Sequence, residues 1–283
     1  MNKLLYFTTC YVRDLPYANR LFGSMKKYTS DIDFVVVLID EEGNIPTNFD
    51  YDFRILSMNS INREILTELS NRYNWDELKN NCKPFVFSHL LKEEKQVIYL
   101  DCSTVIHQSV DIFDKTLASH NAFVVPQLLF AHQHPKENDA LNFGVFHNGC
   151  MGFNASETTD KWIEWWQNHT RFKGYFDPCK GMNTDRLCLE FAPIFFKNTH
   201  VLKHPGVNMG NWNKPERKNI SQQEIITTNY TDLPKSKLLS VVPEYGIPVP
   251  ELSYAQWVIS PKLKKVNQRI DDFFNRYYVY AQD

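Results

Sequence analysis

The order of apolar and polar positions predicts alternating strands and helices at the start of the chain. Residues 4–9 and 33–39 form apolar runs expected of strands, and residues 17–28 between them have the spacing of an amphipathic helix. The second run, FVVVLI, is apolar on both faces, which is typical of a parallel strand covered by helices. These three segments together predict a β-α-β unit with parallel strands.

The same alternation continues as far as residue 169. Pro84 falls where the first turn of a helix tolerates proline, and Ser156 can cap the helix that follows it. The expected elements are strands at 54–58, 97–100 and 122–126, helices at 60–73, 83–91 and 156–169, and a polar loop at 128–139.

Two sequence features predict local packing between residues 142 and 169. The segment 142–154 contains three glycines, which inside a strand mark a bulge or a close backbone approach. Trp162, Trp165 and Trp166 share one helical face, and we expect them to pack in the core.

The C-terminal part of the chain gives weaker signals. Residues 177–218 are rich in proline, glycine, polar and aromatic residues, as expected of a loop-built half of a site. Residues 263–280 have an amphipathic helical pattern that could pack on the domain or lie against a membrane surface, and packing on the domain is commoner. His132 and His134 form an H-x-H pair, for which solvation in a loop is favoured over metal binding.

Composition narrows the class of protein. The 283 residues are 43% apolar, and 31 basic and 33 acidic side chains give a net charge of −2, so bulk attraction to nucleic acid or to an anionic membrane is not expected. No stretch approaches the roughly 20 apolar residues that span a bilayer. Six widely spaced cysteines without a CxxC pair predict free thiols in a reducing, cytoplasmic compartment.

Asp101 is the main candidate for chemistry. It follows the apolar run 97–100 directly, and ligands of open α/β sheets bind beyond the carboxyl ends of the strands. The P-loop, G-x-G-x-x-G and G-x-S-x-G motifs are all missing, so an NTPase, a dinucleotide-dependent dehydrogenase and an α/β-hydrolase are not supported.

A set of short motifs, in order along the chain, extends this interpretation. FTT, LPYA, VLID, NNCKPF, VIYLD, APIFFKNTHVL, HPGVN and WNKPER occur between residues 3 and 218. With these motifs the chain resembles bacterial glycosyltransferases of the GT-A fold related to glycosyltransferase family eight. The resemblance implies a single α/β domain with a Rossmann-like mixed sheet flanked by helices. Its parts would be a nucleotide-sugar half at 1–126, a donor-sugar and acceptor half at 127–218, and a C-terminal extension at 219–283 ending in a helix.

The resemblance also implies roles for individual residues. Asp101 matches the first aspartate of a D-x-D motif whose cation bridges the two phosphates of the donor, and Ser103 stands in place of the second aspartate. Asp185 and Arg186 match a D-Q pair that faces the donor sugar and are the catalytic candidates. The nucleotide-sugar candidates are completed by Thr8, Thr9, Tyr11, Asp40 and Lys83, and the acceptor or sugar candidates are Asn148, Asn208, Trp212, Asn213 and Arg217.

The metal site implied by the resemblance is incomplete. The family supplies a histidine from an H-F-x-G segment, whereas LLSVVPEYG from Leu238 contains none. Two alternatives remain open. Mg²⁺ or Mn²⁺ could bind through Asp101 and the substrate phosphates, or a cation such as Lys83, Arg186 or Arg217 could neutralise the leaving diphosphate without metal.

The function implied is transfer of a sugar from a nucleotide-diphosphate donor to a glycan or lipid-linked acceptor in cell-surface polysaccharide synthesis. The expected location is the cytoplasm, with peripheral contact at the inner face of the membrane as an option, and no nucleic acid partner is expected. The alternatives are a non-catalytic or metal-independent homologue that binds sugar nucleotides or glycans, and a less favoured nucleotidyltransferase. Whether the anomeric configuration is retained or inverted stays open.

Overall fold

The computed structural model describes residues 4–29, 32–40, 51–130 and 137–231. The helix expected at 263–280, the histidines His132 and His134 and most of the extension 219–283 lie outside the described residues.

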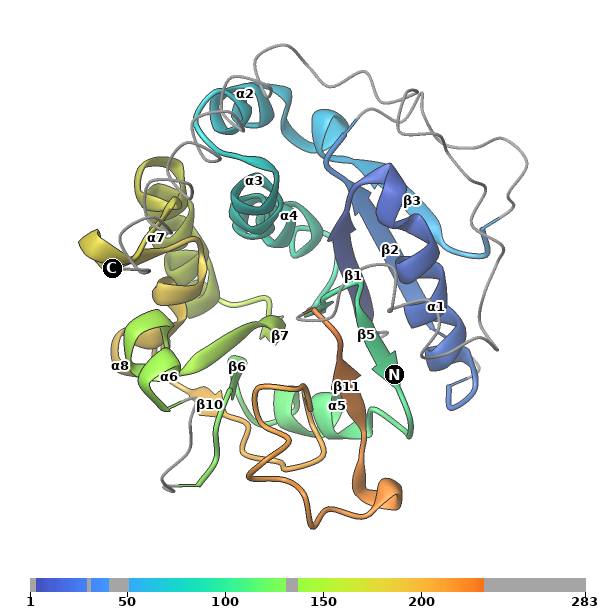
Figure 1. The fold of residues 1–283 in the computed structure, drawn as a ribbon. Coiled ribbons are helices and arrows are strands. Elements are labelled where there is room, and N and C mark those ends of the chain that lie inside the picture. The colour runs from blue at the N-terminus through green and yellow to red at the C-terminus, as the bar shows by residue number, and fades with distance from the viewer. Residues whose placement is uncertain (1–3, 30–31, 41–50, 131–136, 232–283) are drawn as a thin grey trace.

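A seven-stranded sheet forms the centre of the molecule, with six strands parallel to one another (Figure 1). The remaining strand, β7, runs antiparallel to both of its neighbours, β4 and β6. In spatial order the strands are β10 (Thr199–Val201), β6 (Ala122–Pro126), β7 (Phe146–Asn154), β4 (Gln96–Leu100), β1 (Leu5–Cys10), β2 (Asp33–Leu38) and β3 (Arg54–Ser57). The sheet therefore contains strands from both of the predicted parts 1–126 and 127–218.

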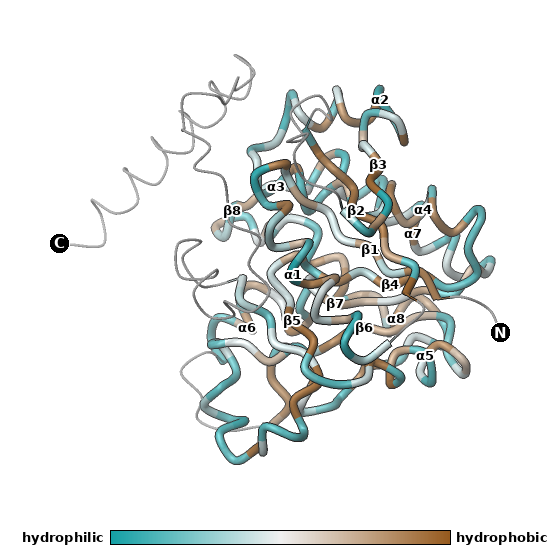
Figure 2. Tube along the Cα trace, turned by 90° about the vertical axis from the view of Figure 1, so that its right-hand side faces the viewer, coloured by the Kyte–Doolittle hydropathy of each residue, from teal (hydrophilic) through white to brown (hydrophobic). Residues whose placement is uncertain are grey.

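Helices cover both faces of this sheet, as the doubly apolar strands predict. Successive residues of a strand point to opposite faces, so Phe7 belongs to one hydrophobic cluster and Tyr6 to the other. One face carries α2 (Met58–Ser70), α3 (Trp75–Asn81), α4 (Lys83–Leu90), α7 (Glu157–Lys173) and α8 (Ala192–Phe195), and the other carries α1 (Leu15–Lys26) and α5 (Asp111–Leu117). In Figure 2 the hydrophilic segments lie on the outer loops and on parts of the helices that surround the sheet.

The tryptophans and the cap of α7 confirm two local predictions. Trp162 and Trp166 are buried and Trp165 is partly buried, all against the face that carries α7. The Ser156 hydroxyl accepts a hydrogen bond from the Thr159 backbone N–H at 3.2 Å and so caps the helix.

The loop predicted at 128–139 overlaps a helix that the sequence analysis did not predict. Residues Glu137–Phe143 form a short helix, α6, and Phe143 belongs to it and not to the following strand. Only Ala140 of this helix is buried, so its seven residues give no apolar periodicity to recognise.

The glycines of β7 mark a close approach, as predicted. A Cβ added to Gly152 would collide with the ring of Phe123 on β6, and the register of β6 and β7 shifts between Val124 and Val125. The sheet therefore needs a residue without a side chain at position 152.

The six cysteines are free thiols, of which only Cys179 is exposed, in agreement with their wide spacing. Within the described residues, no helix combines the length and the apolar character needed to cross a bilayer.

Candidate functional site

The candidate site lies where β1 and β4 end and β7 begins. Because β7 is antiparallel, its first residues lie beside the carboxyl end of β4, and the Asp101 backbone N–H donates to the Gly149 carbonyl at 2.9 Å. A second, two-stranded sheet of β5 (Thr104–Ile106) and β11 (Thr227–Asn229) adjoins this edge just after Asp101. Residues from three distant parts of the chain thus meet at Asp101.

Asp101 is buried, and both of its oxygens face polar groups. Oδ1 accepts from the Ser103 backbone N–H at 2.9 Å and from the Ser103 hydroxyl at 2.7 Å. The other oxygen, Oδ2, lies 3.6 Å from the Lys79 ammonium. Burial alone would raise the pKa of Asp101, but Lys79 and the Ser103 hydrogen bonds hold it well below its usual range. The carboxyl group is therefore ionised.

Lys79 reaches Asp101 from helix α3. Burial lowers the pKa of its ammonium, but Asp101 and other nearby anionic groups outweigh burial and hold the pKa well above its ordinary value. Lys79 is therefore positively charged at the end of β4.

Lys83, one helical turn further on, pairs with a different carboxylate. Its ammonium lies 3.0 Å from Asp185 Oδ2 and donates to the Asn148 carbonyl at 2.9 Å, above the ring of Tyr99. The Asn148 side-chain amide in turn donates to Asp185 Oδ1 at 2.6 Å. Lys83 and Asp185 are fully buried, and the contact of Lys83 with a sugar nucleotide stays a prediction.

A cavity of about 120 Å³ lies beside Asp101. Its walls combine aromatic rings, which suit a flat base, with three carboxylates and one ammonium group, so an anionic group would have to bind at Lys79. The lining residues are Tyr11, Asp14, Tyr17, Asp76, Lys79, Asp101, Cys102, Ser103, Tyr230 and Thr231.

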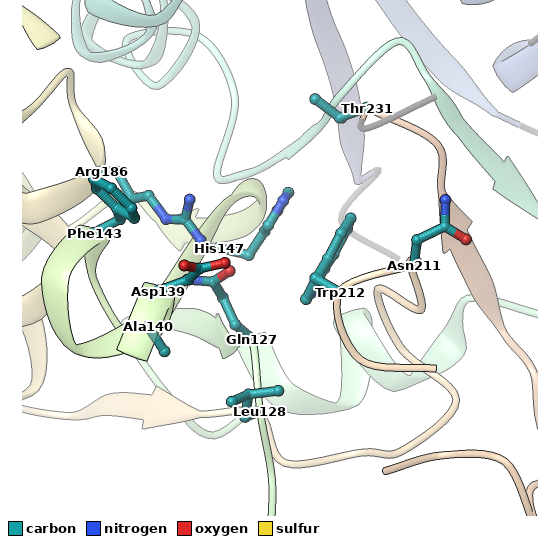
Figure 3. A pocket seen from close by; sticks show the side chains of 10 residues that line it. All are labelled: Gln127, Leu128, Asp139, Ala140, Phe143, His147, Arg186, Asn211, Trp212 and Thr231. Atoms are coloured by element: carbon teal, nitrogen blue, oxygen red, sulfur yellow. The ribbon is translucent and has the colours of Figure 1, made fainter. Parts of the chain in front are cut away.

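A larger cavity of about 330 Å³ lies on the other side of Thr231, which lines both cavities. Trp212 and Asn211 face this cavity from one side, and Arg186, Asp139 and Gln127 face it from the other (Figure 3). Leu128, Ala140, Phe143 and His147 complete its lining. An indole, amides and a guanidinium suit the apolar faces and hydroxyl groups of a sugar.

One nitrogen of the Arg186 guanidinium donates a hydrogen bond and another has no acceptor among the described residues. Its Nε donates to the Phe146 carbonyl at 3.0 Å, while its buried Nη2 has no hydrogen-bond partner among the described residues. Burial lowers the pKa of Arg186 to about 10, which leaves it positively charged at neutral pH.

His147 forms the wall between the two lysine–aspartate pairs and the larger cavity. Its ring stacks on Trp212, with centroids 4.5 Å apart, and its Nδ1 accepts from the Gly149 backbone N–H at 3.0 Å. Burial and the nearby Arg186 lower the pKa of His147 to about 3, so the imidazole is neutral.

The predicted residues of β1 are arranged differently from the expectation. The strand continues to Cys10, so Thr8 and Thr9 lie inside it, fully buried, and only Tyr11 lines the smaller cavity. Asp40, beyond β2, accepts from the Val12 backbone N–H at 2.9 Å, and burial raises the pKa of Asp40 to about 6. Asp40 thus supports the loop that presents Tyr11.

Three of the predicted sugar-binding residues shape the loop beneath Trp212. Asn213 donates to the carbonyls of Gln127 and Asn208, and Asn208 has the positive φ of 54° that asparagine tolerates. Arg217 donates to the Pro205 and Val207 carbonyls. All three are buried, and their direct contact with a sugar stays a prediction, whereas Trp212 lines the cavity.

The described residues do not fit a divalent cation at Asp101. Nowhere in the described ranges do three or more histidine, cysteine, aspartate or glutamate side chains gather as metal ligands. Ser103 and Lys79 already engage the two oxygens of Asp101, and Lys79 places a positive charge where a cation would bind.

The sequence did not point to several residues of the two cavities, among them Lys79, His147 and Thr231, nor to the adjoining Asn229. Lys79 could have been found from its spacing of four residues to Lys83, which puts both lysines on one side of the helical segment. His147 lies beside Asn148 in the glycine-containing stretch, but nothing local indicates its stacking. Asn229 and Thr231 hydrogen-bond to Ser103 across more than 120 positions, and no local pattern signals such a contact.

Sequence comparison does not show a family for this chain. No protein-family profile matches the chain. A curated relative, the uncharacterised protein YfnF of Bacillus subtilis (strain 168), is 22% identical over 206 residues, which cover 68% of this chain and 66% of YfnF.

Structural comparison shows the fold. The galactosyltransferase LgtC, solved in complex with donor and acceptor sugar analogs, superposes with a TM-score of 0.56 at 13% identity, covering 88% of this chain and 98% of LgtC. The glycosyltransferase GlyE of Streptococcus pneumoniae TIGR4 gives 0.55 at 12% identity, covering 88% of this chain and 61% of GlyE. The chain therefore has the GT-A glycosyltransferase fold, as predicted, while the narrower likeness to family eight stays a prediction.

Proposed function

We propose that this protein is a glycosyltransferase that moves a sugar from a nucleoside-diphosphate donor to a hydroxyl group of a glycan or glycolipid. The observation that carries the proposal is the pair of cavities that share Thr231 at the carboxyl edge of a GT-A sheet. The smaller, aromatic and charged cavity suits the nucleoside diphosphate, and the larger suits the donor sugar and the acceptor.

In the proposed reaction, the bond between the anomeric carbon and the diphosphate oxygen breaks, and its electron pair stays on that oxygen. The acceptor hydroxyl oxygen bonds to the anomeric carbon, and its proton is released with the nucleoside diphosphate. Such a reaction needs stabilisation of the negative charge on the leaving diphosphate and alignment of the acceptor.

The residues divide between these two tasks. Arg186 and Trp212 hold the sugar or the acceptor in the larger cavity, where the unused Nη2 of Arg186 binds hydroxyl oxygens. Asp185 acts as a positioning residue, because both of its oxygens are engaged by Lys83 and Asn148. We extend the proposal to a role in cell-surface polysaccharide synthesis in the cytoplasm, with peripheral contact at the inner face of the membrane.

A donor panel tests the proposal. The purified protein is incubated with UDP-, GDP-, ADP- and CDP-sugars, with and without glycan acceptors, and released nucleoside diphosphate is measured. Release from one donor class, lowered at least tenfold in Arg186→Met, supports the proposal. Binding of a donor without turnover under any condition would favour the non-catalytic alternative, and pyrophosphate exchange with sugar phosphates would favour a nucleotidyltransferase.

A further inference from the structure

If the protein is a glycosyltransferase, as proposed above, a positive charge must stabilise the leaving diphosphate, and this inference rests on that proposed function. Two lysines reach this edge of the sheet, Lys79 from α3 and Lys83 from α4, and each lies beside an aspartate. Only Lys79 lines the cavity assigned to the nucleoside diphosphate.

The two ammonium groups differ in how much of their hydrogen-bonding capacity is used. Lys83 hydrogen-bonds to Asp185 and to the Asn148 carbonyl, inside the protein. Within the part of the chain that the structure describes, Lys79 has its 3.6 Å ion pair with Asp101 and no hydrogen bond. A lysine ammonium carries three donors, so Lys79 keeps donors for a ligand in the cavity.

Asp101 is arranged to hold a lysine at this place. Its Oδ1 is occupied by the backbone and the hydroxyl of Ser103, which leaves Oδ2 to pair with Lys79. An aspartate at position 103 would add a second carboxylate for a metal, whereas Ser103 bonds instead to Asp101, Asn229 and Thr231. The position that would be a metal ligand is thus part of a hydrogen-bond network that orients Asp101.

The other cations predicted for this task lie elsewhere. Lys83 is buried and paired with Asp185, Arg217 donates to loop carbonyls, and Arg186 lines the larger cavity. Lys79 is the cation beside Asp101 in the smaller cavity.

We propose that Lys79 takes the place of the divalent cation in this enzyme. Its ammonium, oriented by Asp101, binds the diphosphate of the donor directly and stabilises the negative charge that develops as the nucleoside diphosphate leaves. The reaction then needs no metal at Asp101.

Nucleotide binding tests this assignment. The probes are UDP, GDP, ADP and CDP, titrated by calorimetry into the wild-type protein in EDTA and again in MnCl₂. We expect at least one of them to bind in EDTA with a Kd within threefold of its value in MnCl₂. A Kd that falls tenfold or more when Mn²⁺ is added would overturn the assignment while leaving the glycosyltransferase proposal intact.

Variants of Lys79 provide the second test. Lys79→Met should weaken the binding of that nucleoside diphosphate in EDTA at least tenfold, whereas Lys79→Arg should keep it within fivefold. The parent nucleoside, which has no phosphate, should bind Lys79→Met as well as the wild type in ligand-observed NMR. Lys161→Met is the matched control, because Lys161 forms an exposed pair with Glu157 on α7. Equal diphosphate binding by Lys79→Met and the wild type would contradict the inference.

A third variant tests whether a metal site can be created at Asp101. Lys79→Met combined with Ser103→Asp should bind Mn²⁺ in the presence of the nucleotide, seen as loss of the free Mn²⁺ signal in electron paramagnetic resonance, while the wild type should not. If Lys79→Met does not fold, the comparison of EDTA with MnCl₂ on the wild type still decides. If none of the nucleotides binds under any condition, the glycosyltransferase proposal fails and this inference fails with it.

Discussion

Two lysine–aspartate pairs lie one helical turn apart at the same edge of the sheet, and they are built for different tasks. The inner pair, Lys83 with Asp185, has a 3.0 Å separation and side chains 1% and 0% exposed. The outer pair, Lys79 with Asp101, has a 3.6 Å separation and side chains 16% and 9% exposed. The same two residue types thus form a fully buried contact in one place and a pair that lines a cavity in the other.

The difference follows from what surrounds each pair. Asn148 bonds to both members of the inner pair, so Lys83 makes two hydrogen bonds within the protein and both oxygens of Asp185 are engaged. The outer pair faces a cavity, and its lysine makes no hydrogen bond among the described residues. Breaking a fully buried ion pair leaves a charge without water or partner, whereas breaking a pair that borders a cavity costs less because water can reach the remaining charge.

Breaking the inner pair should have the largest effect. Lys83→Met would leave the Asp185 carboxylate buried without its cation and should lower the free energy of unfolding by about 3–5 kcal/mol, measured by urea denaturation. The double variant Lys83→Met with Asp185→Asn should recover part of this loss. A loss below about 1 kcal/mol in the single variant would show that the inner pair does not stabilise the fold.

Removing the carboxylate of the outer pair should affect activity more than stability. Asp101→Ala releases Lys79 from its oriented position and should lower donor turnover at least about 100-fold, equivalent to about 2.7 kcal/mol of transition-state stabilisation. Steady-state kinetics with the best donor, together with a thermal melt close to that of the wild type, checks this. Unchanged turnover in Asp101→Ala would contradict the candidate site.

The pKa of His147 tests whether this residue, which lies beside both pairs, is buried as the structure shows. Its pKa is lowered to about 3 in the folded protein, so between that value and about 6.5 the unfolded chain binds a proton that the folded chain does not. The stability contributed by neutral His147 is therefore complete above pH 6.5 and is lost as the pH falls, by at most about 1.4 kcal/mol per unit.

His147→Phe isolates this contribution while keeping a ring against Trp212. Urea denaturation of both proteins between pH 7 and pH 4.5 should show a steeper loss of stability in the wild type than in the variant. Parallel curves would mean that His147 is not held neutral by burial.

Removing the lysine of the outer pair should have the smallest effect on stability. Lys79→Met should lower the free energy of unfolding by about 1–2 kcal/mol, less than Lys83→Met, because Asp101 borders a cavity and keeps its two hydrogen bonds from Ser103. Urea denaturation beside Lys83→Met measures the contrast directly. A loss as large as that of Lys83→Met would mean that the outer pair is also structural.

Much of the fold could be predicted from local patterns. The strand 122–126 has its predicted bounds, and the first helix differs only at its ends, beginning at Leu15 with Pro16 in its first turn. These elements follow from apolar periodicity and capping, which act over a few residues. Helix α6 was missed because only one of its residues is buried.

The site was predicted less completely than the fold. Asp101 was located because a carboxylate after a buried strand is visible locally. The pairing of Lys83 with Asp185, 102 positions away, and the stacking of His147 on Trp212 depend on how β7 and the later loops return to β4. Lys83 was therefore predicted at a nucleotide contact, whereas the structure buries it.

Hydrophobic periodicity and strand ends are local properties, so the amino-acid sequence was enough to predict an α/β sheet with Asp101 directly after one of its central strands. Tertiary packing sets which lysine faces the cavity and which is buried. Lys79 and Lys83 have the same side chain four residues apart, so their roles depend on the distant groups packed against them, Asn148 and Asp185 for one and an open cavity for the other.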